Sequence, residues 1–118
     1  MLRRAAWLAL LACVPPAWAH TPAPEDVVAT IAEPAARVAA GVERAERDMR
    51  NPRVLLVRVG PDWFARPRDA RAAAAAEWRE AWRRAVPDGV VAVLDAATDR
   101  SVVRWGPGGT VADVRDPG

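Results

Sequence analysis

The side chains that could carry chemistry in this chain are few, and a histidine is the most suggestive of them. His20 is the only histidine of the 118 residues, and it directly follows the segment Ala17-Trp18-Ala19. Cleavage after Ala19 would give His20 a free α-amino group, which together with the imidazole offers nitrogen donors that suit Cu(II). The chain has no second histidine to complete such a site. A cleavage site that precedes a histidine is therefore the simpler interpretation, and weak Cu(II) binding at His20 is an alternative.

Catalytic chemistry finds little support among the remaining side chains. Ser101 is the only serine, and lysine, tyrosine and glutamine do not occur, whereas an activated nucleophile needs a base within hydrogen-bond reach. The carboxylates of Asp95 and Asp99 bracket the turn DAATD, whose spacing lacks the alternating ligands of a calcium loop. We expect a protein without catalysis or cofactor, in which Asp95 caps this turn and Asp99 tolerates a left-handed conformation.

Aromatic and arginine side chains in one short segment are the better candidate for a binding surface. The segment Asp62-Trp63-Phe64 follows an expected strand and falls in an expected loop, where exposed aromatic side chains often bind partners. Arg66 and Arg68 lie beside it and can pair with anions. We therefore expect the partner-binding residues to be Trp63, Phe64, Arg66 and Arg68.

The first 19 residues have the pattern of a secretory signal peptide. Arg3 and Arg4 form a short positive region, ten apolar residues follow over 5–14, and Ala17-Trp18-Ala19 matches a small-x-small cleavage site. A stable membrane span takes about 20 apolar residues, so this run is too short to remain as an anchor. Leu10-Leu11-Ala12-Cys13 also resembles a lipobox, and a lipoprotein acylated at Cys13 is the alternative.

Removal of this segment changes the charge of the chain and takes away its only cysteine. Arg3 and Arg4 account for the whole formal charge of +2, so the mature chain has no overall basic surface for nucleic acid. The abundance of alanine, arginine, valine and proline suggests a GC-rich bacterium. We expect a periplasmic or secreted accessory protein that binds an envelope protein or a second copy of itself. We expect no nucleic-acid partner and no membrane span after cleavage.

The mature chain is expected to be one small α+β domain with the element order α-β-α-β-β-β. Residues 20–26 are polar and proline-rich, which is typical of a flexible tail. Over residues 27–51 the apolar side chains recur at steps of three and four, which predicts an amphipathic helix. This helix would pack on its own domain or pair with a partner helix. Pro34 either kinks it or begins a new helix.

Residues 53–115 are expected to form a small α/β unit, in which helices cover one mixed sheet. The apolar runs 53–59 and 90–95 predict strands buried on both faces. The helix expected over 67–86 would connect them as parallel neighbours. On that helix Trp78 and Trp82 lie four residues apart, and we expect both to cover the sheet.

Two shorter strands, 101–105 and 110–114, are expected to extend the sheet in antiparallel order. The glycine-rich segment Gly106-Pro107-Gly108-Gly109 would reverse the chain between them. Residues 91–105, VAVLDAATDRSVVRW, resemble the strand-turn-strand units of small exported domains of the PepSY type. The resemblance covers 15 residues, and it implies no particular function.

Overall fold

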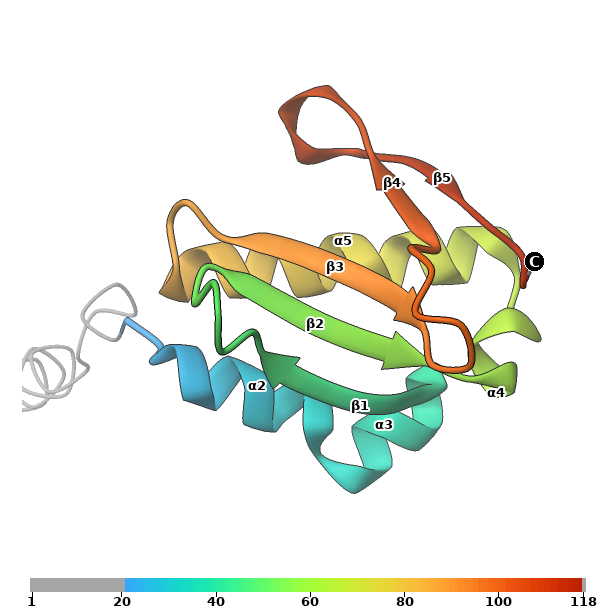
Figure 1. The fold of residues 1–118 in the computed structure, drawn as a ribbon, viewed down its shortest axis with the longest axis horizontal. Helices are drawn as coiled ribbons and strands as arrows, with labels where there is room; N and C mark the ends of the chain where they lie inside the picture. Colours follow the sequence, from blue (N-terminus) through green and yellow to red (C-terminus); the bar gives the residue numbers. More distant parts are fainter. Residues whose placement is uncertain (1–20, 118) are drawn as a thin grey trace, which may run out of the picture.

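A three-stranded sheet lies at the centre of the computed structural model, which describes residues 21–117 (Figure 1). The helices are α2 (Pro24–Ala32), α3 (Pro34–Ala40), α4 (Pro61–Phe64) and α5 (Arg68–Ala85), with a 3-10 turn, η2 (Pro107–Gly109). The strands are β1 (Val42–Arg47), β2 (Val54–Val59), β3 (Val90–Asp95), β4 (Val103–Trp105) and β5 (Val111–Val114). The α+β class expected from the sequence is confirmed.

The β2-α5-β3 segment forms the centre of the sheet. The strand order is β1-β2-β3; β2 and β3 run parallel, with Leu55 opposite Val91 and Val57 opposite Val93. Helix α5 begins directly after Pro67 and connects the two strands. The two strands, the helix between them and their parallel pairing therefore match the prediction. Strand β1 completes the sheet by pairing antiparallel with β2.

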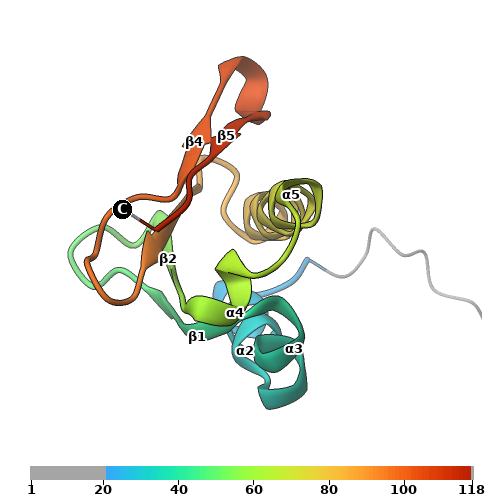
Figure 2. The same cartoon turned by 90° about the vertical axis from the view of Figure 1, so that its right-hand side faces the viewer.

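The helices lie on one side of this sheet, and the other side is open (Figure 2). Burial alternates along β2 and β3, so that Leu55, Val57 and Val93 are fully buried against the helices. The expectation that both faces are covered is wrong. The open face stays uncovered because Arg58 on β2, the middle strand, places a charged side chain there. A second apolar layer on this face would bury that charge.

Three tryptophans form the centre of the core between the sheet and α5. Trp82 and Trp63 are fully buried, and Trp78 is 9% exposed. The rings of Trp63 and Trp78 stack, with 5.3 Å between their centroids and 23° between their planes. The indole N–H of Trp82 donates to the carbonyl of Arg53 at 2.8 Å, which satisfies its one polar atom. The prediction that Trp78 and Trp82 cover the sheet is confirmed.

The single helix expected over residues 27–51 is wrong. Pro34 begins a second helix, and α3 ends at Gly41, whose φ of 77° is left-handed. A Cβ at Gly41 would overlap the backbone of Trp63, so this tight reversal needs glycine. After this reversal, residues 42–47 form a strand instead of continuing the helix, because their backbone pairs with β2. Residues 24–26, expected in a flexible tail, form the first turn of α2.

The last two strands form a separate ladder instead of extending the central sheet (Figure 1). Within residues 21–117, an isolated antiparallel bridge between Leu94 and Ser101 connects β3 to the segment that leads into β4. The indole N–H of Trp105 donates to the carbonyl of Val91 at 2.8 Å. This side-chain bond uses a backbone carbonyl of β3 that a neighbouring strand would otherwise bind. Because β5 packs beside α5, the ladder leaves the plane of the sheet. The expectation of one mixed sheet is corrected in this respect.

Acid should weaken the first turn of α3. The carboxylate of Glu33 accepts from the N–H groups of Ala35 and Ala36 at 3.1 and 3.0 Å, and these bonds lower the pKa of Glu33. A lowered pKa stabilises the fold above the ordinary glutamate value, and this contribution is lost as pH falls through the lowered value. We expect amide exchange at Ala35 and Ala36 to gain protection from acid to neutral pH in the wild type. In Glu33→Gln it should be independent of pH after correction for intrinsic rates, and equal profiles would contradict the assignment.

Candidate functional site

A hollow of about 830 Å³ lies where the parallel strands β2 and β3 end. In sheets with parallel strands, ligands commonly bind outside the carboxyl ends of those strands. We call this cavity the strand-end hollow. It is lined by Glu43, Gly60, Pro61, Phe64, Ala65, Asp95, Ala96, Ala97, Asp116 and Pro117.

Backbone hydrogen bonds hold the ends of the strands together under this hollow. The N–H of Gly60 donates to the carbonyl of Gly41 at 3.0 Å, and the N–H of Ala96 donates to the carbonyl of Val59 at 2.9 Å. A Cβ at Gly60 would overlap the carboxylate of Glu43. The missing side chain therefore lets Glu43 reach across the end of β2.

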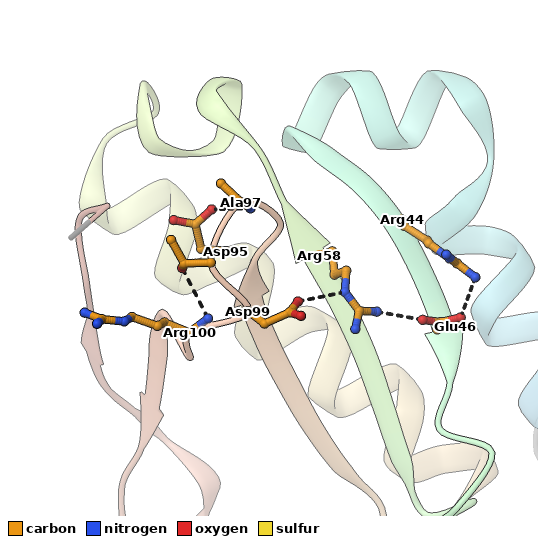
Figure 3. Close-up of polar contacts among 8 residues, drawn as sticks. Arg44, Glu46, Arg58, Asp95, Ala97, Asp99 and Arg100 are labelled. Carbon is orange, nitrogen blue, oxygen red and sulfur yellow. Dashed lines mark hydrogen bonds and ion pairs between the residues drawn. The ribbon is translucent and has the colours of Figure 1, made fainter.

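Asp95 is the buried polar side chain of the hollow. It is 6% exposed, and its Oδ1 accepts from the N–H of Ala97 at 2.9 Å (Figure 3). Its carbonyl accepts from the N–H of Asp99 at 2.8 Å, and Asp99 has a left-handed φ of 58°. Both turn predictions are thus confirmed.

A buried arginine holds Asp116, one of the residues that line the hollow, in place. Arg71 is 3% exposed; its guanidinium donates to the carbonyls of Arg66 and Arg115 at 3.1 and 3.3 Å, and pairs with Asp116 at 3.1 Å. These bonds fix the C-terminal segment beside α4 and neutralise Asp116. Our sequence reasoning missed Arg71. Arg71 could have been recognised from its spacing, because it lies on the same face of α5 as the buried residues Ala75 and Trp78. A charged side chain on a buried helix face needs a specific partner.

The four residues expected to bind a partner do not share one surface. Trp63 is in the core, so its expected exposure is wrong: the loop is the helical turn α4, which folds Trp63 onto Trp78. Phe64 is half-buried and lines the strand-end hollow. Arg66 lines a different groove of about 350 Å³ among α2, α3 and α5. Arg68 is exposed and approaches Asp113 at 3.8 Å.

A row of ion pairs crosses the open face of the sheet beside the hollow (Figure 3). Glu46 pairs with Arg44 at 2.8 Å and with Arg58 at 2.6 Å, and Arg58 also donates to Asp99 at 3.2 Å. The hydrogen bond from Arg58 to Asp99 is the main cause that raises the pKa of Arg58. This row ties the Asp95–Asp99 turn to β1 and β2. Asp99 is therefore paired outside the hollow, whereas Asp95 lines it.

Over the part of the chain that the structure describes, no group of three or more histidine, cysteine, aspartate or glutamate side chains is arranged to hold a metal. None of the helices within 21–117 combines the length and the apolar character that crossing a membrane requires. His20, Cys13, Ala17 and Ala19 lie outside the described residues.

Comparison with known proteins gives no relative from which a role could be transferred. No protein family matches the chain, and no curated protein or solved structure matches it. The strand-end hollow and the residues that line it are therefore the features from which a function can be inferred.

Proposed function

We propose that this protein is a non-catalytic binding protein of the bacterial envelope, with the strand-end hollow as its ligand site. The observation that carries the proposal is the hollow itself. Its volume of about 830 Å³ falls within the range of about 300–1,000 Å³ that is typical of small-molecule pockets. Its walls are mostly apolar, with Phe64 as the aromatic group and Asp95 as the one buried polar side chain. Such a lining is typical of sites that bind a small molecule.

The absence of catalysis is proposed from the chemistry of the lining. The residues around the hollow include no serine, cysteine, histidine or lysine, which are the usual nucleophiles and proton-transfer groups. Two of the three carboxylates come from separate elements, with Glu43 on β1 and Asp95 at the end of β3. Among the described residues neither carboxylate contacts a basic side chain that would activate it. Binding is the simplest use of this arrangement.

The envelope location is proposed from the sequence pattern over residues 1–19. The arginine pair, the apolar run and the Ala17-Trp18-Ala19 site support export to the periplasm. Acylation at Cys13 would anchor the same domain at a membrane surface. The ligand is proposed to be a small molecule rather than the protein partner expected for Trp63 and Phe64, because Trp63 is buried.

A neutral fluorescent probe tests whether the hollow binds small molecules. N-phenyl-1-naphthylamine brightens in apolar surroundings, and we expect it to bind the wild-type protein saturably at one site. Ala97→Trp should weaken this binding at least about tenfold by filling the hollow, a loss of about 1.4 kcal/mol. Ala76→Trp is the matched control, because Ala76 is exposed on α5 and does not line the hollow. Equal probe binding in the two variants would contradict the proposal.

A further inference from the structure

We infer that β1 is a dimerisation strand, which pairs antiparallel with β1 of a second copy of this chain. The inference goes beyond the proposed function by assigning a protein partner. Strand β1 lies at one end of the order β1-β2-β3, and within residues 21–117 no strand pairs with its outer edge. Such an edge presents unpaired backbone N–H and C=O groups, which another strand can bind.

The pairing of β1 with β2 fixes which backbone groups of β1 face outward. The N–H of Asp48 donates to the carbonyl of Val54 at 2.9 Å, at the start of this antiparallel ladder. Because hydrogen-bonded and non-hydrogen-bonded pairs alternate along such a ladder, the backbone groups of Glu46 face β2, whereas those of Ala45 and Arg47 face outward. With a two-fold axis at Ala45, the two Ala45 residues would exchange both of their backbone hydrogen bonds.

The side chains of β1 are complementary in charge to a second copy in antiparallel order. In the segment Glu43-Arg44-Ala45-Glu46-Arg47, residues at equal distances from Ala45 carry opposite charges. A two-fold axis at Ala45 therefore places Arg44 of each copy opposite Glu46 of the other, on the open face of the sheet (Figure 3). Opposite charges in directly opposing positions of two strands stabilise their pairing.

Charge also disfavours the neighbouring registers. Moving the axis by one residue would place Glu46 opposite Glu46 of the second copy in one direction, and Arg44 opposite Arg44 in the other. Like charges directly opposite each other destabilise a strand pair. On the side of α3, the carbonyl of Glu43 already accepts from Arg37 at 3.0 Å, which leaves less of the edge free there. The pairing is therefore centred on Ala45.

Two exposed apolar side chains near the ends of β1 fit the same arrangement. Val38, near the end of α3, is 77% exposed, and Met49, two residues after β1, is 97% exposed. With the axis at Ala45, Met49 of each copy lies level with Gly41 of the other, where α3 ends. Dimerisation would thus bring Met49 near Val38 of the second copy and remove apolar surface from water.

Sedimentation velocity of the full mature chain tests for the dimer. We expect a reversible equilibrium between monomer and dimer, whose dissociation constant rises with salt because the cross-strand charges are screened. Amide hydrogen exchange at Ala45 should slow as the protein concentration rises, whereas exchange at Glu46, whose N–H faces β2, should not depend on concentration. A dissociation constant above about 1 mM, which corresponds to very weak association, would overturn the inference.

Charge reversal assigns the interface to β1. Arg44→Glu puts a negative charge opposite Glu46 of the second copy, and we expect the dissociation constant to rise at least about tenfold. Arg104→Glu is the matched control, because it makes the same charge change at an exposed residue of β4, and it should dimerise like the wild type. Glu46→Arg should weaken the dimer as Arg44→Glu does, and the double variant should restore it.

A mixture of Arg44→Glu and Glu46→Arg tests the register. Each variant repels its own copies, but when one pairs with the other, both opposing positions again carry opposite charges. We therefore expect dimers to form on mixing, and their absence would overturn the inference. If Glu46→Arg does not fold, Arg44→Glu and the exchange of Ala45 still decide. Dimerisation of Arg44→Glu as strong as that of Arg104→Glu, or exchange at Ala45 that is independent of concentration, would also overturn the inference.

Discussion

Trp63→Ala should destabilise the domain by about 3–5 kcal/mol, as expected when a large buried aromatic side chain leaves a cavity. Trp63 is fully buried, and its ring stacks on Trp78 at 5.3 Å. The total stability of a small domain is about 5–15 kcal/mol, so this single change should remove a large part of it. Chemical denaturation followed by fluorescence of the remaining tryptophans measures the loss.

Phe64→Ala is the neighbouring control for that experiment. Phe64 is half-buried and lines the strand-end hollow, so its removal should cost less free energy of unfolding and should weaken binding of the neutral probe instead. The two adjacent aromatic residues therefore have separate roles in stability and binding. A Trp63→Ala protein that unfolds at the wild-type denaturant concentration would show that Trp63 does not belong to the core.

Arg71→Met should release the C-terminal segment and destabilise the domain by about 1–3 kcal/mol, the cost of leaving buried polar groups without a partner. In the wild type Arg71 binds two backbone carbonyls and Asp116. Beside these contacts the N–H of Arg115 donates to the carbonyl of Val102 at 2.8 Å. Amide hydrogen exchange should therefore become much faster at Arg115 in the variant, and binding of the neutral probe should weaken as one wall of the hollow is lost.

Arg68→Met provides the matched control, because Arg68 is exposed and its approach to Asp113 at 3.8 Å is a surface ion pair. Such pairs contribute about 0–1 kcal/mol, so stability and exchange at Arg115 should stay near the wild-type values. Unchanged exchange at Arg115 in Arg71→Met would mean that Arg71 does not hold the C-terminal segment.

The central β2-α5-β3 unit could be predicted from the sequence because its signals are local. Two apolar runs flank a helix with buried tryptophans at a spacing of four, and proline or glycine marks the ends of these elements. Residues 42–47 carried no comparable signal. Their spacing also fits a helix, and only pairing with β2, together with the left-handed turn at Gly41, makes them a strand.

The candidate site could be predicted only in part. The turn that begins at Asp95 follows from local turn chemistry. The hollow around it does not, because its walls are brought together by the sheet from the segments 43, 60–65, 95–97 and 116–117. The burial of Trp63 likewise depends on Trp78, which lies 15 positions along the chain. From the sequence alone, Trp63 and Phe64 were therefore both expected to be exposed binding residues.

The position of a bound ligand tests the central claim most directly. Nuclear Overhauser contacts from the ring protons of N-phenyl-1-naphthylamine should reach the ring of Phe64 and the methyl group of Ala96, which line the strand-end hollow. Contacts to Trp78 and Ala39 instead would place the ligand in the groove among α2, α3 and α5. That result would contradict the assignment of the strand-end hollow as the binding site.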